Sequence, residues 1–462
     1  MITAVCYWEK EFFSFLICSG ICGALGGLCM IGKSKRLDFY AKEGFITVAL
    51  AWIVISIFGC LPFVFSRAIP NFINALFETV SGFTTTGSTI LSAKQIDGMA
   101  KSLLIWRSFT HWVGGMGVLV FVMAFLPLSG ARNLHMMQAE STGASVSKLV
   151  PKIRQTAIIL YAIYFSMTVL QFILLLCGGI SVFEALNIAF ATAGTGGFAV
   201  KSSSLFEYSS YIQIVTTVFM LLFSINFASY YLAFRGKIKD AFNAEVRAFL
   251  LIVIIAVAGI TLNLCLADGY IGTTFTSQGD ALKHSAFTVA SIISTTGFAT
   301  VDFNLWPSLS KIILLALMFV GTCAGSTGGG IKVSRHLVLF KGAKHELRRM
   351  IQPKQIKKIT LDGKVVEHEV VRSINAYLVA FLLIFVASLL VVSLDGQSIE
   401  TSFSAVSATI NNVGPGLGEV GPTGSFANFS WWSKLTFIFD MLAGRLEIFP
   451  MLILFSPATW KK

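Results

Sequence analysis

Apolar residues gather in nine long runs that are separated by shorter polar connections. The runs lie near residues 11–31, 44–66, 103–128, 157–178, 211–234, 247–266, 311–340, 374–394 and 435–455. A helix needs about 20 largely apolar residues to cross the hydrocarbon core of a bilayer, so each run predicts a membrane span. Glu9, Lys10 and Glu11 precede the first run in place of a basic stretch, which predicts a retained helix rather than a cleaved leader.

Four further apolar stretches are too short to cross a bilayer, and each lies in a connection between two long runs. They are Ile73–Phe83, Val182–Ala193, Ala281–Ile293 and Ile399–Ile410. Runs of this length are candidates for re-entrant helices, whose irregular backbone must be buried in protein or line a watery cavity. Each stretch is followed by a glycine motif, and the motifs recur at intervals of about 100–120 residues: Thr84–Gly87, Gly194–Gly197, Ser294–Gly297 and Asn411–Gly414.

Four copies of one unit can close a ring around an axis, and a ring of backbone oxygens is one way to line a cation pathway. Glycine suits this task because successive carbonyls turn toward one ion only at backbone angles that a β-carbon disfavours. Close helix packing is the simpler explanation for one such motif, but not for four on the same side. The candidate ion-binding residues are Thr85, Thr86, Gly87, Thr195, Gly196, Gly197, Thr295, Thr296, Gly297, Asn412, Val413 and Gly414.

The second motif has two possible registers, because Gly194 could take the place of Gly197. We prefer Gly197, since Thr195–Ala199 parallels Thr295–Ala299. Re-entrant helices that enter from outside point their partially negative C-termini inward, which favours a cation at the centre of the membrane. Near the outer ends of three of them lie acidic residues for which capping is the simpler interpretation: Glu78, Glu184 and Glu400.

Composition excludes an ordinary water-soluble fold. Of the 462 residues 55% are hydrophobic and 13% are charged, whereas soluble domains carry about 25% charged residues. The net charge of +12 comes from basic residues in alternate connections. This pattern predicts that these connections face the cytoplasm and that the glycine motifs face outward. It also argues against binding of nucleic acid. The densest basic group is Lys341, Lys344, Arg348, Arg349, Lys354, Lys357 and Lys358.

No residue pattern predicts an enzyme, a metal centre or a disulfide framework. The eight cysteines lie mostly inside apolar runs, where free buried thiols are expected, and the six histidines show no ligand spacing. An intramembrane enzyme and a non-conducting scaffold are therefore the weaker alternatives to an ion-conducting pore.

Two polar features interrupt the apolar runs on the side opposite the motifs. Arg445, in the last run, should face water or a partner and raise the barrier to cations, unless it snorkels to the membrane surface. A phosphate-binding loop would need lysine directly after the last glycine of the seventh run, but Ile331 intervenes. We therefore interpret that glycine-rich segment as a gate beneath the filter, formed by Gly325, Ser326, Thr327, Gly328, Gly329 and Gly330.

Several strings resemble the TrkH/TrkG/KtrB family of potassium-uptake membrane subunits. They are Arg107–Gly117, Gly321–Lys332, Asn411–Gly418 and Gly444–Phe449, and the resemblance covers nearly the whole chain from about residue 44. It implies an all-α polytopic membrane protein with four helix–pore-loop–helix repeats in pseudo-fourfold arrangement around one ion pore. Family members often have two helices before the first repeat, whereas this chain has room for one, which would put its N-terminus outside.

By the matching motifs, the resemblance implies filter glycines at Gly87, Gly197, Gly297 and Gly414, a gate at Ala324–Ile331 and a pore arginine at Arg445. It further implies potassium as the ion bound at the filter and transported, no cofactor in this chain, and a homodimer among the lipids of the bacterial inner membrane. A cytoplasmic, TrkA-like ring of nucleotide-binding regulatory subunits is the implied partner. A serine in the first repeat of related plant transporters admits sodium, so a sodium-coupled or sodium-permeable transporter is the alternative function.

The repeats predict five segments along the chain. An N-terminal helix and basic loop occupy residues 1–43, and repeat 1 follows at 44–130. Repeats 2, 3 and 4 occupy 131–240, 241–350 and 351–462, and the last helix of repeat 3 is interrupted.

Overall fold

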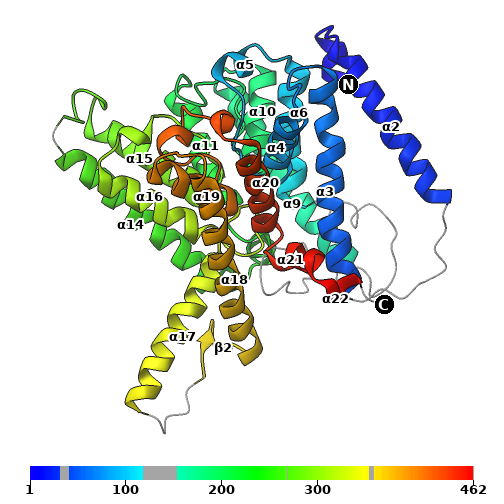
Figure 1. Cartoon of the computed structure of the whole chain (residues 1–462). Coiled ribbons are helices and arrows are strands. Elements are labelled where there is room, and N and C mark those ends of the chain that lie inside the picture. Colours follow the sequence, from blue (N-terminus) through cyan, green and yellow to red (C-terminus); the bar gives the residue numbers. More distant parts are fainter. Residues whose placement is uncertain (32–40, 118–152, 268, 353–357, 461–462) are drawn as a thin grey trace.

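The computed structural model describes residues 1–31, 41–117, 153–267, 269–352 and 358–460. Its helices form a bundle of four repeats, each with a long first helix, a short re-entrant helix and a second helix (Figure 1). The first helices are α3 (Ala41–Phe65), α9 (Ile153–Cys177), α14 (Ala244–Leu266) and α18 (His368–Ser393). The re-entrant helices are α4 (Phe72–Phe83), α10 (Val182–Ala193), α15 (Gln278–Ile293) and α19 (Ile399–Ile410). The second helices begin with α6 (Lys101–Gly115), α11 (Ser210–Phe223), α16 (Ser308–Val320) and α20 (Trp431–Arg445).

The four re-entrant helices begin in the same way. An N-cap side chain precedes each helix and accepts a hydrogen bond from the backbone N–H three residues later; these caps are Asn71, Ser181, Ser277 and Ser398. Such a cap satisfies an otherwise unpaired N–H of the first turn and stabilises a helix by about 1 kcal/mol. Helices this short gain little from intrinsic propensity, so caps and packing define where they begin.

The re-entrant helices also close the four repeats into a ring. Each packs between the two helices of its own repeat and against the second helix of the preceding repeat. The inter-repeat pairs are α10 on α6, α15 on α11, α19 on α16 and α4 on α20. Because the first repeat packs on the last, the arrangement is closed, and the predicted fold class is confirmed.

Among the described residues, five helices are long and apolar enough to cross a membrane: α2 (Glu11–Ile31), α3, α9, α14 and α18. The seventh predicted run is divided as expected, into α16 and α17 (Val333–Ile351). The run over residues 211–234 is divided too, because α11 meets α12 (Phe227–Phe234) at an angle of 90°, although the two helices together are long and apolar enough for one broken span. The last run is divided as well, into α20 and α21 (Phe449–Phe455). Residues 118–128 of the third run lie outside the described residues.

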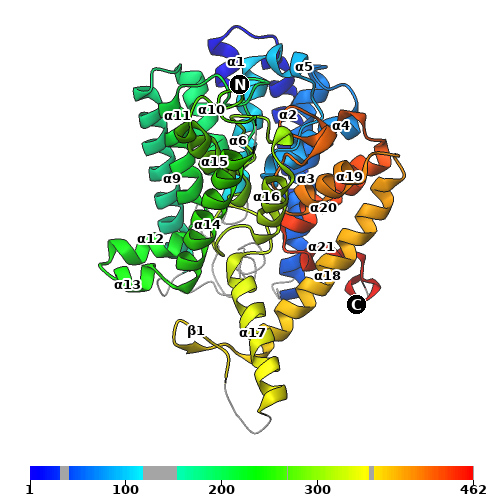
Figure 2. The same ribbon diagram turned by 90° about the vertical axis from the view of Figure 1, so that its left-hand side faces the viewer.

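The remaining elements lie at the two ends of the bundle. The short helices are α1 (Ile2–Cys6), α5 (Ala93–Asp97), α13 (Ile238–Ala241) and α22 (Pro457–Trp460), and the 3-10 turns are η1 (Phe303–Leu305), η2 (Gly418–Val420) and η3 (Phe426–Asn428). Strands β1 (Thr360–Leu361) and β2 (Lys364–Val365) form an antiparallel hairpin. Asp362 and Gly363 connect them, both with positive φ, as a two-residue hairpin turn requires. Figure 2 shows that α17 and this hairpin project from the end opposite α1 and α5.

Candidate functional site

Each re-entrant helix ends in the same backbone pattern. Two residues before the final glycine, the chain takes a positive φ, and the glycine itself does so again. The four non-glycine residues are Thr85 (φ 56°), Thr195 (54°), Thr295 (57°) and Asn412 (55°), and the glycines are Gly87 (84°), Gly197 (74°), Gly297 (84°) and Gly414 (101°). In all four repeats the residue between them is outside the left-handed region. Alternation of this kind turns successive carbonyls to the same side of the chain.

A left-handed conformation is strained for a β-branched residue and costs on the order of 1–3 kcal/mol. Hydrogen bonds at the helix end stabilise it here. In each repeat the residue after the left-handed one donates its N–H to a carbonyl five residues earlier, which is the bond of a Schellman helix end. The pairs are Thr86 to Ser81 (2.9 Å), Gly196 to Ala191 (2.9 Å), Thr296 to Ser291 (2.9 Å) and Val413 to Ala408 (2.8 Å). Gly197 therefore occupies the same position in its repeat as the other three glycines.

The four segments contact one another around a closed ring. A β-carbon on Gly297 would lie 2.5 Å from the carbonyl oxygen of Val413, and one on Gly414 would lie 2.6 Å from that of Thr86. At Gly87 and Gly197 the obstructing atoms are the carbonyl oxygens of the corresponding residues in the next repeat, Gly196 and Thr296. Every glycine thus packs on the residue before the glycine of the next repeat, and the fourth repeat packs on the first. No side chain fits at these positions without displacing backbone.

Almost all carbonyls of this ring accept no hydrogen bond from the residues that the structure describes. Of the twelve candidate ion-binding residues only Gly414 has a carbonyl that accepts a hydrogen bond from the described chain, from the Ser88 hydroxyl at 3.0 Å. Most of these residues are fully buried, among them Thr85, Thr295 and Asn412 at 0% exposure. A buried polar group without a partner costs about 1–3 kcal/mol, so a cluster of such carbonyls needs an explanation.

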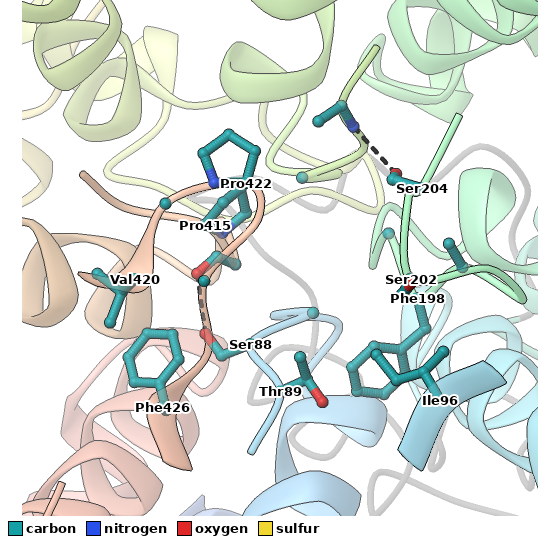
Figure 3. A pocket seen from close by; sticks show the side chains of 18 of the residues that line it. Ser88, Thr89, Ile96, Phe198, Ser202, Ser204, Pro415, Val420, Pro422 and Phe426 are labelled. Carbon is teal, nitrogen blue, oxygen red and sulfur yellow. Dashed lines mark hydrogen bonds between the residues drawn. The ribbon is translucent and has the colours of Figure 1, made fainter. Parts of the chain in front are cut away.

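A cavity opens on the outer side of the ring. It has a volume of about 80 Å³ and is lined by all four glycines, Gly87, Gly197, Gly297 and Gly414. Figure 3 shows its wall, with Ser88 beside the fourth repeat and Phe198 and Phe426 on opposite sides. The candidate residues from four distant parts of the chain are therefore brought to one place, with an opening that leads to them.

Several of the candidate side chains also bond to neighbouring groups. The hydroxyls of Thr86 and Thr296 lie 2.8 Å and 2.7 Å from the hydroxyls two residues earlier, at Thr84 and Ser294. Asn412 donates its amide to the Thr86 hydroxyl (2.9 Å) and to the carbonyl of Met441 in α20 (2.9 Å). The second bond connects the motif of the fourth repeat directly to α20, the helix of the same repeat that carries Arg445.

A buried ion pair braces the first repeat, and the sequence analysis missed it. The expectation that Glu78 caps α4 is wrong. Glu78 lies in the middle of the helix at 1% exposure and pairs with Arg107 of α6 at 2.7 Å. The same carboxylate accepts the N–H of Ile90 (3.1 Å) and the hydroxyl of Thr89 (3.0 Å), just beyond the motif. The Arg107 guanidinium stacks over the Phe198 ring at 4.0 Å, which links repeats 1 and 2.

His111 completes this link between the repeats. Its Nδ1 lies 2.7 Å from the carbonyl of Gly82, and its Nε2 accepts the N–H of Phe198 at 3.3 Å. A β-carbon on Gly196 would overlap the His111 ring. The other two acidic residues behave as expected: Glu184 forms a capping box with Ser181 at the start of α10, and Glu400 lies in the first turn of α19.

The glycine-rich segment lies directly beneath the ring. Gly329 donates its N–H to the Thr295 hydroxyl (2.7 Å), and Gly330 donates to the Asn411 carbonyl (3.0 Å). On its other side the Gly325 carbonyl accepts the N–H of Phe227, the first residue of α12 (3.1 Å). The bend between α11 and α12 therefore has a physical cause: it frees backbone groups that bond to the segment.

Arg445 joins this segment to α6. Its guanidinium donates to the carbonyl of Thr327 (2.7 Å) and to those of Gly114 and Gly115, the latter at 2.8 Å. The side chain is only 6% exposed, so the alternative that it snorkels to the membrane surface is wrong. Neither the backbone partners nor the depth of the side chain is visible in the local sequence.

Lys332 is a second buried cation in the same segment, and the sequence analysis did not single it out. Its side chain is 2% exposed, and its ammonium donates to the Thr322 hydroxyl (3.1 Å) and to the Gly328 carbonyl. Lys332 itself takes a positive φ of 82°. Its signal in the sequence was its position two residues after the last glycine of the run, which argued against a phosphate-binding lysine.

Comparison with known proteins relates this arrangement to one family. The family model described as "TrkH: Cation transport protein" matches residues 11–462. The Trk system potassium uptake protein TrkH of Vibrio parahaemolyticus is 35% identical over 97% of this chain and 91% of that protein. The Trk system potassium uptake protein TrkG of Escherichia coli K12 is 33% identical over 100% of this chain and 94% of that protein.

The fold is similar to a solved structure over its whole length. The crystal structure of the potassium transporter TrkH from Vibrio parahaemolyticus superimposes with a TM-score of 0.87 and 32% sequence identity. The similarity covers 100% of this chain and 95% of that one. The closed ring, the segment beneath it and the bent second helices therefore all lie within the region of similarity.

Proposed function

The chain belongs to the TrkH family of cation transport proteins, and from this we propose that it carries potassium ions across the bacterial inner membrane. The pathway runs through the ring of four re-entrant segments. One observation carries the proposal: buried carbonyls from four repeats gather in a closed ring and, among the described residues, almost none accepts a hydrogen bond. A transported cation supplies the missing partner, because carbonyl oxygens can replace its hydration shell.

The proposed filter consists of the last three residues of each motif, Thr85–Gly87, Thr195–Gly197, Thr295–Gly297 and Asn412–Gly414. Potassium is the transported substrate at these residues and no cofactor is needed for its passage. The ring is rigid in the way that selectivity requires, because each glycine is packed against backbone of the next repeat. Cation transport is not an enzymatic class of function, in keeping with the family.

The proposed gate is the segment Gly325–Gly330 together with Arg445. The segment spans the space beneath the ring and is bonded to it through Thr295 and Asn411. Arg445 holds the segment to α6 and places a positive charge below the filter. Opening requires these bonds to break, and glycines give the backbone the freedom to rearrange.

We also propose the assembly that the family resemblance implies. The chain forms a homodimer in the membrane and docks on a cytoplasmic, TrkA-like ring of nucleotide-binding subunits. Basic residues on the side opposite the filter provide the surface for docking, among them Lys237 and Lys239 at the start of α13. A sodium-coupled or sodium-permeable transporter of the same architecture remains the second candidate, since sodium also binds carbonyl oxygens.

Flux through proteoliposomes tests the proposal. Purified protein should carry ⁸⁶Rb⁺ as a potassium analogue, and uptake should be inhibited by potassium more than by sodium. Gly87→Ser should lower the preference for potassium, because a β-carbon there strikes the carbonyl of the next repeat. Gly179→Ser is the matched control, since Gly179 has a similar φ (81°) and open space around it. Absence of any flux, or an unchanged preference in Gly87→Ser, would overturn the assignment.

A further inference from the structure

Helix α17 and the hairpin β1–β2 project from the basic end of the bundle (Figure 1, Figure 2). The hairpin turn is attached to the bundle, because Asp362 accepts a hydrogen bond from the N–H of Ala244 (2.8 Å) and lies 3.7 Å from Arg247. Ala244 is the first residue of the membrane-length helix α14. The turn therefore lies at the level where α14 leaves the membrane.

A pocket of about 440 Å³ lies between α17 and the start of the hairpin. Lys341 donates to the carbonyl of Thr360 at 2.8 Å and holds the two elements together across it. Basic side chains converge on this pocket from both elements, and the lysines and arginines among them are Lys341, Lys344, Arg348, Arg349 and Lys358. A volume of this size is typical of pockets that bind small ligands.

The positive charges of the pocket are poorly compensated. Its lining contains no acidic side chain. Glu346 is exposed and lies 3.8 Å from Arg349 and 3.6 Å from His345. In the part of the chain that the structure describes, no carboxylate pairs with Lys344, Arg348 or Lys358. A site with this surplus of cations favours an anionic ligand, because phosphate and carboxylate groups accept charge-assisted hydrogen bonds.

One end of the pocket lies close to the start of the membrane-length helix α14. Thr360 precedes Asp362 by two positions, so the carbonyl that Lys341 contacts lies within about 7 Å of the turn that is bonded to the start of α14. The headgroup layer on each side of a bilayer is about 5–8 Å thick. Apolar side chains also line the pocket, and Phe340 is 71% exposed. A ligand that is anionic at one end and apolar at the other fits this combination.

We propose that this pocket binds the headgroup of an anionic phospholipid from the cytoplasmic leaflet. The phosphate accepts hydrogen bonds from Lys344 and Arg348, and the acyl chains leave past Phe340 toward the bilayer. The site couples lipid composition to the position of α17, which begins at Val333, directly after the proposed gate. The binding itself does not depend on the transport function, so the two proposals fail separately.

The charges set the size of the expected effect. Each lysine or arginine close to an anionic membrane surface strengthens binding about fivefold, so removal of three should weaken it about a hundredfold. The test variant is Lys341→Gln/Lys344→Gln/Arg348→Gln. The matched control is Arg235→Gln/Lys237→Gln/Lys239→Gln, which removes the same charge from exposed positions of another segment at the same end of the bundle.

Binding can be measured on the purified full chain in detergent by native mass spectrometry. Phosphatidylglycerol and phosphatidylcholine are titrated separately, and glycerol phosphate and ATP are titrated as soluble phosphate compounds. The single variant Lys344→Gln serves as a milder change, because this exposed side chain has no carboxylate partner in the described chain. Equal thermal stability of all variants shows that the fold is intact.

We expect wild type and the control variant to bind phosphatidylglycerol in preference to phosphatidylcholine. The triple variant should lose this preference, and Lys344→Gln should weaken it about fivefold. Equal retention of phosphatidylglycerol by the pocket and control variants would overturn the proposal, since the lipid would then be held elsewhere. Binding of glycerol phosphate or ATP as tight as that of the lipid would also overturn it, in favour of a soluble ligand.

Discussion

Replacement of Arg445 tests the proposed gate most directly. The guanidinium is held on one side by the carbonyls of Gly114 and Gly115 at the end of α6. On the other side a single bond of 2.7 Å connects it to Thr327 in the glycine-rich segment. Movement of the segment away from the filter therefore breaks one bond from a charged donor and leaves the anchor on α6 intact.

The magnitude follows from that one bond. A hydrogen bond from a charged group contributes about 1.5–3 kcal/mol. Loss of the bond to Thr327 should therefore shift the ratio of open to closed protein about tenfold to a hundredfold. Arg445→Met removes both the bond and the charge while it keeps much of the side-chain volume. We expect this variant to conduct more ⁸⁶Rb⁺ than wild type in proteoliposomes without a regulatory subunit.

Arg445→Lys separates the bond from the charge. A single ammonium cannot reach both the α6 carbonyls and Thr327 with the geometry of the planar guanidinium. If the bond holds the gate closed, the lysine variant should leak nearly as much as the methionine variant. If the charge is the barrier, the lysine variant should behave like wild type. Flux that falls in both variants, in protein that melts at the wild-type temperature, would refute the role of Arg445 as a latch.

Three further changes test other contacts. Glu78→Gln leaves the buried Arg107 without its charge partner and should destabilise the fold by about 3–5 kcal/mol. The melting temperature should therefore fall, and the double variant Glu78→Gln/Arg107→Met should partly restore it. An unchanged melting temperature would show that the pair is dispensable. Thr295→Val removes the acceptor for the Gly329 N–H. We expect a higher basal ⁸⁶Rb⁺ flux with an unaltered preference for potassium over sodium. A changed preference would place the hydroxyl in the filter itself. Burial acts to raise the pKa of Asp395, but hydrogen bonds from the start of α20 lower it below its ordinary value, so its contribution to stability is lost as pH falls through that lowered pKa. The difference in melting temperature between wild type and Asp395→Asn should therefore shrink as pH falls below about 4 and vanish below the lowered pKa, and a gap that stays constant throughout this acid range would contradict the linkage.

The bounds of the re-entrant helices could be predicted because their signals are local. A short apolar run defines each helix, a Ser or Asn cap stands before it, and a turn-forming motif follows. For three of the four re-entrant helices, both predicted ends lie within one residue of the observed ends. The fourth, α15, begins three residues earlier than predicted, at Gln278, because its cap Ser277 lies before polar residues that the apolar pattern does not include.

The bend after Phe223 and the pairing of Glu78 with Arg107 could not be predicted, because their causes lie far away in the sequence. The bend depends on bonds to Gly325, about a hundred residues later, and residues 211–234 read as continuously apolar. Glu78 resembles a helix-end acid until α6 brings Arg107 to it. The ion-binding role of the twelve filter residues and the domain boundaries stay predictions.

The proposed filter and the proposed gate differ in how their backbone is restrained, and this difference favours movement of the proposed gate. In the filter, the N–H groups of Thr86 and its three counterparts are bonded to the helix that precedes them, and every glycine is packed on the neighbouring repeat. A change in one segment would therefore displace all four. The segment Gly325–Gly330 is held instead by separate bonds to several elements, and those to Thr295 and Arg445 involve side chains of these residues. Breaking a few of these bonds leaves the ring closed, so conduction can be controlled beneath the filter without loss of its selectivity.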